Sequence, residues 1–134
     1  MTTVIFKTSA DHLPGVLRTS MYALRGEPQH LERGDLILLA KLTKDLRRGE
    51  PQIQFSMVFE RVRKDTGKES DAIWGRHWPW LVDCFSLKAL ARPFNITDHQ
   101  VTLKDYVHGG TVVYVDLQDH QLLEKRGFFD GVGE

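Results

Sequence analysis

The sequence predicts an α+β domain, a small mixed β-barrel or β-sheet flanked by helices. Strand-length apolar runs, alternating or continuous, recur along most of the 134 residues, whereas helical periodicity is confined to residues 13–21 and 117–126. Helices in two places, rather than one after each strand, favour an α+β pattern over a βαβ array. The length and a hydrophobic content of 41% fit one domain over residues 1–134.

The N-terminal part predicts a strand followed by a helix. Residues 3–6 form a short, β-branched apolar run that is typical of a strand. Ser9 or Asp11 can cap a helix over about residues 13–21, in which Pro14 is tolerated only within the first turn. The core-facing positions of this helix are Leu13, Val16, Leu17 and Met21.

The middle of the chain predicts three more strands. Residues 35–40 are apolar on both faces, which is typical of a strand buried on both sides. Residues 52–63 alternate between apolar and polar side chains, which predicts a long strand. A loop is expected over residues 69–79, followed by an alternating strand over residues 80–87, and Pro93 ends this extended stretch.

The last third of the chain predicts one strand and one helix. Residues 101–102 form at most a short extended piece, and residues 111–115 are typical of a strand. Asp116 then caps a helix over about residues 117–126. The inward positions of that helix are Leu117, Leu122 and Leu123.

The charge balance excludes broad electrostatic coating of nucleic acid but leaves a local basic surface possible. The 18 Lys and Arg residues equal the 18 Asp and Glu residues, so no polycationic tail coats nucleic acid indiscriminately. The balance is a cancellation, because residues 1–105 carry a net charge of +3 and residues 106–134 a net charge of −3. A local basic face in the first part therefore remains compatible with the sequence.

Compartment signals are few. No apolar run approaches the roughly 18–20 residues that cross a bilayer, and the N-terminus lacks the pattern of a secretory signal. The single cysteine cannot form an internal disulfide, which fits a reducing compartment. We therefore expect a cytoplasmic chain with no membrane partner.

No catalytic or metal-binding motif is found. The sequence has neither a phosphate-binding glycine loop nor Cys and His residues at zinc spacing. Cys84 lies mid-strand between Asp83 and Phe85, which favours a buried, unreactive thiol over a nucleophile. The sequence therefore predicts a protein that is not an enzyme, with no catalytic residue, metal or cofactor.

The most informative segment is residues 73–80, Ile-Trp-Gly-Arg-His-Trp-Pro-Trp. All three tryptophans of the chain, Trp74, Trp78 and Trp80, lie within it, together with Arg76 and His77. Trp80 opens a strand and can simply cover the edge of the sheet. Exposed indole rings in a polar loop are costly unless they bind something, and base stacking is worth roughly 1–3 kcal/mol. We therefore expect Trp74 or Trp78 to contact a ligand.

The order of several short segments resembles a known family. Those segments are residues 4–9, 21–23, 34–38, 74–85, 101–105 and 122–125. Residues 21–23, Met-Tyr-Ala, are similar to a Val-Trp-Ala string, and residues 74–85 to a Trp-rich loop that runs into a strand. Together they resemble the YTH and EVE branch of the PUA-like superfamily, which reads modified bases in nucleic acids, and the likeness covers about residues 3–126.

The resemblance implies an aromatic cage around a flipped-out base. Tyr22, Trp74 and Trp78 would form the walls of this cage, and a methyl group on the base would be buried between them. The resemblance implies that the base edge is read near the first helix, and that basic side chains hold phosphates. The base-edge residues would be Thr8, Ser9, Asp11 and His12. The phosphate-binding residues would be Lys7, Arg76 and Lys104.

The resemblance also implies a partner. The expected ligand is RNA or DNA that carries a modified base, either N6-methyladenine or a methylated cytosine. Compact domains of this kind can be the specificity part of a larger multi-subunit assembly, including a modification-dependent restriction system. The chain departs from the family at Tyr22, where the family has Trp, and at Lys104, which replaces Arg only after a shift of one position.

Two other functions fit the same residues. One is an enzymatic or small-molecule-binding PUA-like domain that uses Asp11, His12 or Asp105 beside the aromatic pocket. The other is a protein-interaction domain in which the tryptophans bury against a partner chain.

Overall fold

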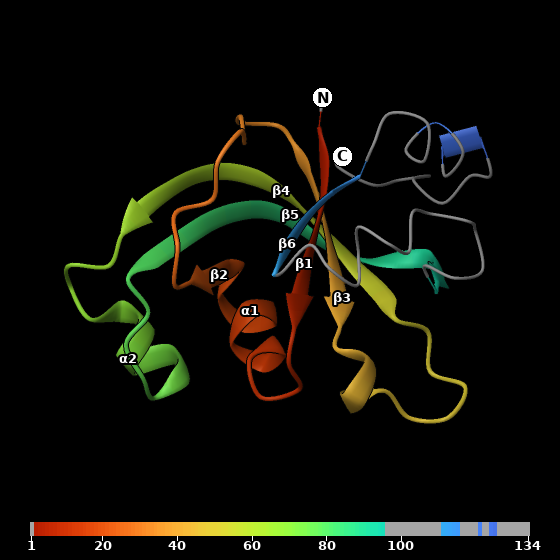
Figure 1. Ribbon diagram of the computed structural model, residues 1–134, viewed down its shortest axis with the longest axis horizontal. Helices are drawn as coiled ribbons and strands as arrows, with labels where there is room; N and C mark the ends of the chain where they lie inside the picture. The colour runs from red at the N-terminus through yellow and green to blue at the C-terminus, as the bar shows by residue number, and fades with distance from the viewer. Residues whose placement is uncertain (1, 96–110, 116–120, 122–123, 126–134) are drawn as a thin grey trace.

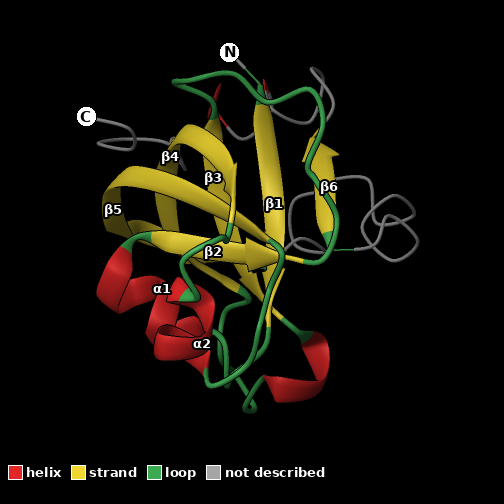
Figure 2. Cartoon of the chain, turned by 90° about the vertical axis from the view of Figure 1, so that its left-hand side faces the viewer, coloured by secondary structure: helices red, strands yellow, loops and turns green. Residues whose placement is uncertain are grey.

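The structure is a computed structural model that describes residues 2–95, 111–115, 121 and 124–125. Its elements are β1 (Thr3–Thr8), α1 (Leu13–Thr19), β2 (Met21–Leu24), β3 (Leu36–Lys41), the 3-10 helix η1 (Thr43–Asp45), β4 (Ile53–Lys64), α2 (Glu69–Trp74), β5 (Trp80–Phe94) and β6 (Val112–Val115). The strands form one curled, mixed sheet, and α1 and α2 lie at the same end of it (Figures 1 and 2). The predicted fold class, a small mixed sheet or barrel flanked by helices, is confirmed.

The sheet is a half-barrel whose two edges stay unpaired among the described residues. Its strand order is β2-β5-β4-β3-β1-β6, so β2 and β6 are the edge strands. The β1 and β3 strands pair in parallel, and the other neighbours pair antiparallel. The long strands β4 and β5 arch over β2, α1 and α2 (Figure 1) and change register at several bulges, which bend the sheet.

Both faces of the sheet are covered, because the central strands are apolar on both sides. Side chains of β3 alternate between two core clusters: Leu36, Leu38 and Ala40 belong to one, and Ile37 and Leu39 to the other. The predicted two-sided burial of residues 35–40 is therefore confirmed from Asp35 to Ala40. The second cluster also contains Val16 of α1, so the helix closes that face.

Three sequence-based boundaries were wrong. Residues 21–24, which were expected to end the first helix or follow it, form the edge strand β2. The segment expected as a loop over residues 69–79 begins with the helix α2. The last long strand does not stop near residue 87 but continues to Phe94, beyond Pro93. Proline is compatible with a strand near its end, where one ladder hydrogen bond can be lost.

Two further predictions lie outside the described residues. These are the extended piece at residues 101–102 and most of the final helix expected over residues 117–126. Among the described residues, no helix is both long enough and apolar enough to cross a membrane.

A glycine allows the two helices to touch. Gly15 is buried on α1 and lies against the end of α2. A Cβ atom placed there would stand 2.8 Å from Ile73 Cγ2 and 2.8 Å from Trp74 Cε2, and closer still to Trp74 Nε1. Real Cβ atoms essentially never approach so closely. The missing side chain is therefore what lets Trp74 lie on α1.

We predict that Gly15→Ala destabilises the fold. Alanine would gain roughly 1 kcal/mol in helix propensity, but overpacking of a tight contact costs about 1–3 kcal/mol, so the free energy of unfolding should fall. Urea unfolding measures the change. The matched control is Gly67→Ala, because no atom lies within 4 Å of a Cβ at that position. Equal stabilities of the two variants would contradict the packing role of Gly15.

Candidate functional site

A large cleft lies where the half-barrel stays open, between the edge strands β2 and β6. Its volume is about 870 Å³. Both edge strands contribute to its wall, together with the end of β1, the start of α1, and the loops after β2 and α2. The lining residues are Lys7, Ser9, His12, Tyr22, Ala23, Leu24, Arg25, Gly26, Glu27, Pro28, Gln29, His30, Leu42, Arg76, Trp78, Thr111, Val112 and Tyr114.

His12 is the centre of an aromatic cluster at the cleft. The turn before α1 holds it, since its backbone N–H donates to both the carbonyl and the hydroxyl of Ser9, each at 3.2 Å. Its imidazole stacks on the indole of Trp74, with ring centroids 4.5 Å apart and planes 4° from parallel. The indole N–H of Trp74 donates to the carbonyl of His12 at 2.9 Å. Tyr22 and Trp78 meet the imidazole edge-on at 5.1 and 5.3 Å.

The imidazole of His12 is held neutral. Only 9% of the residue is exposed, and burial together with the nearby charge of Arg76 lowers its pKa to about 4. Its Nε2 atom is buried and has no hydrogen-bond partner. An unsatisfied buried ring nitrogen costs free energy, so this position is one that a bound polar group would stabilise.

Trp78, which also lines the cleft, has an unpartnered ring nitrogen as well. Its Nε1 atom is buried without a hydrogen-bond partner. Two guanidiniums lie over the indole ring, that of Arg76 at 4.7 Å and that of Arg25 at 5.5 Å from the ring centroid. The ring is therefore apolar surface beside positive charge, an arrangement suited to a flat, electron-rich ligand.

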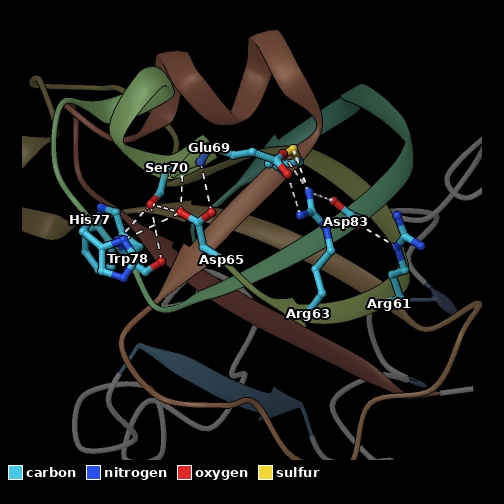
Figure 3. Close-up of polar contacts among 9 residues, drawn as sticks. Arg61, Arg63, Asp65, Glu69, Ser70, His77, Trp78 and Asp83 are labelled. Carbon is cyan, nitrogen blue, oxygen red and sulfur yellow. Dashed lines mark hydrogen bonds and ion pairs between the residues drawn. The ribbon is translucent and has the colours of Figure 1, made fainter. Parts of the chain in front are cut away.

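A buried carboxylate fixes the backbone at Trp78 (Figure 3). Asp65 accepts hydrogen bonds from the N–H groups of Glu69 and Ser70, each at 3.0 Å, and from the Ser70 hydroxyl. The same hydroxyl oxygen accepts the backbone N–H of Trp78 at 2.9 Å. Burial alone would raise the pKa of Asp65, but these hydrogen bonds and the nearby His77 lower it overall. Asp65 thus anchors both the start of α2 and the segment that carries Trp78.

Arg63 holds α2 through a second set of charged contacts (Figure 3). Arg63 on β4 donates to Glu69 at 2.7 and 2.8 Å and to Asp83 on β5 at 2.8 Å, and Arg61 also donates to Asp83 at 2.8 Å. The hydrogen bonds that Arg63 donates to Glu69 and Asp83 raise the pKa of its guanidinium. Both arginines are therefore committed to carboxylates on the outside of the sheet.

The cleft has its own set of cations. Lys7, Arg25 and Arg76 line it, against one acidic residue, Glu27. Burial lowers the pKa of the Lys7 ammonium, and the backbone N–H of Lys7 is tied to the carbonyl of Thr111 at 2.9 Å. The cleft is thus locally basic although the whole chain carries no net charge.

The structure brings six of the ten predicted site residues to the cleft: Lys7, Ser9, His12, Tyr22, Arg76 and Trp78. Thr8 is buried and its hydroxyl donates to the carbonyl of Phe6 at 3.3 Å. Asp11 is exposed and does not line the cleft. Trp74 stacks on His12 and does not itself line the cleft. Lys104 is outside the described residues.

Tyr22 contributes to the floor of the cleft more than to a free wall. It is 2% exposed, packs on Phe6 at 4.5 Å between ring centroids, and donates its hydroxyl to the carbonyl of Lys7. Burial raises the pKa of this hydroxyl. Of the three expected cage residues, Trp78 is therefore the one that presents an indole to the cleft without another ring stacked on it.

Sequence reasoning missed several residues of the cleft. The segment Arg25–His30 and the edge residues Ala23 and Tyr114 belong to it. The Gly and Pro residues at positions 26 and 28 signal a loop, but they do not indicate that Tyr114 holds that loop by donating its hydroxyl to the carbonyl of Gln29. Only the pairing of distant strands brings these residues together.

Metal and thiol chemistry find no support among the described residues. They contain no group of three or more His, Cys, Asp and Glu side chains that could hold a metal ion. Cys84 is buried, as predicted, and burial raises the pKa of its thiol.

Comparison with known proteins finds a likeness in structure but not in sequence. No known family profile and no curated protein sequence matches it. Among solved structures, the crystal structure of ASCH from Zymomonas mobilis aligns with a TM-score of 0.59 at 8% sequence identity, over 92% of this chain and 94% of that one. The chain therefore has an ASCH-type, PUA-like fold. At this identity the likeness establishes the fold alone, and the closer resemblance to the YTH and EVE branch stays a prediction.

We predict that His12 stays neutral until the pH approaches 4. Its pKa in the folded chain is about 4, against an ordinary value of 6.5. Between these values the unfolded chain takes up a proton that the folded chain refuses, so the free energy of unfolding should rise with pH across this window. NMR titration of the imidazole and urea unfolding at pH 4.5 and 7 measure both effects. His12→Gln should show a smaller rise, and an imidazole that titrates near 6.5 would contradict the burial.

We also predict that Ser70 positions Trp78, whereas Glu69 only supports α2. Ser70→Ala removes a buried hydroxyl that bridges Asp65 and the Trp78 N–H, which should cost about 1–3 kcal/mol and move the Trp78 indole signal in the NMR spectrum. The matched control is Glu69→Gln on the same helix turn. It weakens a partly exposed ion pair worth about 0–1 kcal/mol and should leave the indole signal in place. An unmoved indole signal in Ser70→Ala would contradict the positioning role.

Proposed function

We propose that the cleft binds one unstacked base of a nucleic-acid strand, and that the chain is a binding module rather than an enzyme. The carrying observation is the pairing of Trp78 with His12 in a basic cleft. An indole and a neutral imidazole, each with a buried unpartnered nitrogen, line the same hollow. PUA-like folds are generally associated with nucleic acids, which supports this choice of ligand.

Stacking supplies the affinity in this proposal. A base leaving a duplex stack costs a few kcal/mol, and contact with an aromatic side chain returns roughly 1–3 kcal/mol per base. Trp78 provides the ring, and its backbone is held by Ser70, so little conformational entropy is lost on binding. The volume of about 870 Å³ is large enough for a nucleotide.

The edge of β2 offers a backbone donor and acceptor for the base. The N–H of Cys84 donates to the carbonyl of Ser20, which makes Ser20 and Cys84 a hydrogen-bonded pair. Hydrogen-bonded and non-hydrogen-bonded pairs alternate along an antiparallel ladder. The backbone N–H and C=O groups of Tyr22 and Leu24 therefore point toward β5, and those of Ala23 point away from it. Ala23 lines the cleft on the edge strand. Its N–H and C=O can therefore meet the complementary edge of a base.

Cations around the cleft supply contacts to the sugar-phosphate backbone. Lys7, Arg25 and Arg76 are close enough to line the same hollow, and arginine pairs well with phosphate oxygens. Three cations make a short contact. We therefore infer that phosphates position the strand and that the aromatic cleft provides most of the discrimination.

We further propose that the base is modified, either N6-methyladenine or a methylated cytosine. The supporting feature is the indole of Trp78, because a methyl group buried against it gains roughly 0.8 kcal/mol per carbon. A role as the specificity part of a restriction system, or of another multi-subunit assembly, stays a prediction from the family resemblance.

The test is a titration with matched oligonucleotides. Single-stranded DNA and RNA probes carry one central adenine, N6-methyladenine, cytosine or 5-methylcytosine, and binding is followed by fluorescence anisotropy. We expect the methylated probe to bind more tightly than its unmodified match. Trp78→Ala should lower that affinity about 5- to 150-fold, in line with the loss of one stacking contact.

Phe85→Ala is the matched control. Phe85 is an exposed aromatic residue with an arginine, Arg33, over its ring at 6.0 Å, but it lies outside the cleft. Its substitution should change the affinity less than twofold. Equal affinity for methylated and unmodified probes would refute the modified-base proposal, and equal losses in the two variants would refute the cleft as the binding site. Binding of mononucleotides with no gain from a longer strand would indicate a small-molecule site instead.

A further inference from the structure

Two arginines from distant parts of the chain lie on one indole ring. Arg25 follows the edge strand β2, and Arg76 follows helix α2, yet both guanidiniums lie over Trp78, at 5.5 and 4.7 Å from the ring centroid. All three residues line the cleft. A base that stacks on a face of Trp78 covered by a guanidinium must therefore compete with that guanidinium for the ring.

These guanidiniums are held by nothing else in the described part of the chain. Arg61 and Arg63 are tied to Asp83 and Glu69, whereas neither Arg25 nor Arg76 has a hydrogen bond or an ion pair to a described residue. Both are exposed on the surface. Their charge is thus available to an incoming anion, and only a contact with the ring has to be given up.

Two buried ring nitrogens also indicate that side chains cover the site. His12 Nε2 and Trp78 Nε1 are buried and unpartnered although their rings line the hollow. A ligand reaches them only after neighbouring side chains move. The arrangement therefore has the character of a covered site.

We propose that Arg25 and Arg76 cover Trp78 until a phosphate draws them off, so that base stacking requires a phosphate on the same ligand. This inference rests on the proposed function and deepens it. An arginine–phosphate pair makes two charge-assisted hydrogen bonds and is stronger than an exposed cation–π contact, so the exchange is favourable. A free base or nucleoside has no such anion and must displace the guanidinium unaided. The site therefore selects nucleotides within a strand over free nucleosides.

The proposal predicts opposite effects of one double variant on two ligands. In Arg25→Ala/Arg76→Ala the indole is uncovered, so N6-methyl-2′-deoxyadenosine should bind about two- to tenfold more tightly than to the unaltered chain. The 5′-monophosphate of the same nucleoside should bind at least tenfold more weakly, because its anion loses both partners. Binding is measured by NMR titration on the Trp78 indole signal, identified by its absence in Trp78→Ala. Arg33→Ala, which uncovers Phe85 outside the cleft, should change neither affinity.

Inorganic phosphate provides a readout without any base. It should move the Trp78 indole signal in the unaltered chain as the guanidiniums leave the ring, and leave it unmoved in the double variant. An unmoved signal in the unaltered chain would contradict the exchange.

Other outcomes separate this inference from the proposed function. If the double variant binds the nucleoside with unchanged affinity and the nucleotide more weakly, the arginines are simple phosphate contacts. That result would overturn the proposal that they cover Trp78. Weaker binding of both ligands would mean that the guanidiniums stay and stack with the base, which also overturns it. If oligonucleotide binding depends on Trp78 in either case, the proposed function stands without the cover. If no oligonucleotide binds, both fail.

Discussion

The stack of His12 on Trp74 is the contact on which the cleft depends. It joins the start of α1 to the end of α2, and it exists because Gly15 has no side chain to hold the indole away. The indole N–H is used on the carbonyl of His12, so Trp74 is committed to the fold. In return the imidazole is buried, kept neutral and turned edge-on toward Tyr22 and Trp78. Trp74, half-buried beneath the imidazole that it supports, is therefore a different use of tryptophan from the open cage wall that the sequence suggested.

Four arginines of the chain have two different kinds of partner. Arg61 and Arg63 are paired with carboxylates, and these pairs fasten α2 to β4 and β5. Arg25 and Arg76 are instead placed on an indole, without acidic partners among the described residues. A net charge of zero is therefore a poor guide to the potential in the cleft, since the cations that a ligand meets are those left unneutralised. Because such cations are few, the affinity of the proposed nucleic-acid contact should depend only weakly on salt concentration.

Local pattern was enough to predict the central strands, but it could predict only part of the site. The two-sided burial of β3 and the alternation of β4 follow directly from their side chains. Helix α2 was missed because its cap is not adjacent: Asp65, four residues before Glu69, accepts the N–H groups that begin the helix. Strand β2 was missed because four residues become a strand only by pairing with β5. Arg25 reached the cleft by the same long-range pairing, and nothing in its neighbourhood along the chain signals that outcome.

The open seam of the half-barrel explains why such residues meet there. Closing the sheet between β2 and β6 would satisfy their backbone groups and abolish the hollow. Leaving it open costs unpaired edges, which proteins usually protect. Here the edge residue Ala23 faces a cleft that is bounded by the loop after β2, and Tyr114 on the opposite edge ties that loop down through the carbonyl of Gln29. The unpaired donor and acceptor are thus kept apart from another sheet edge but remain within reach of a planar polar ligand. Under the proposed function, the same backbone feature that would be a liability on a flat surface takes part, in this recess, in recognising the base.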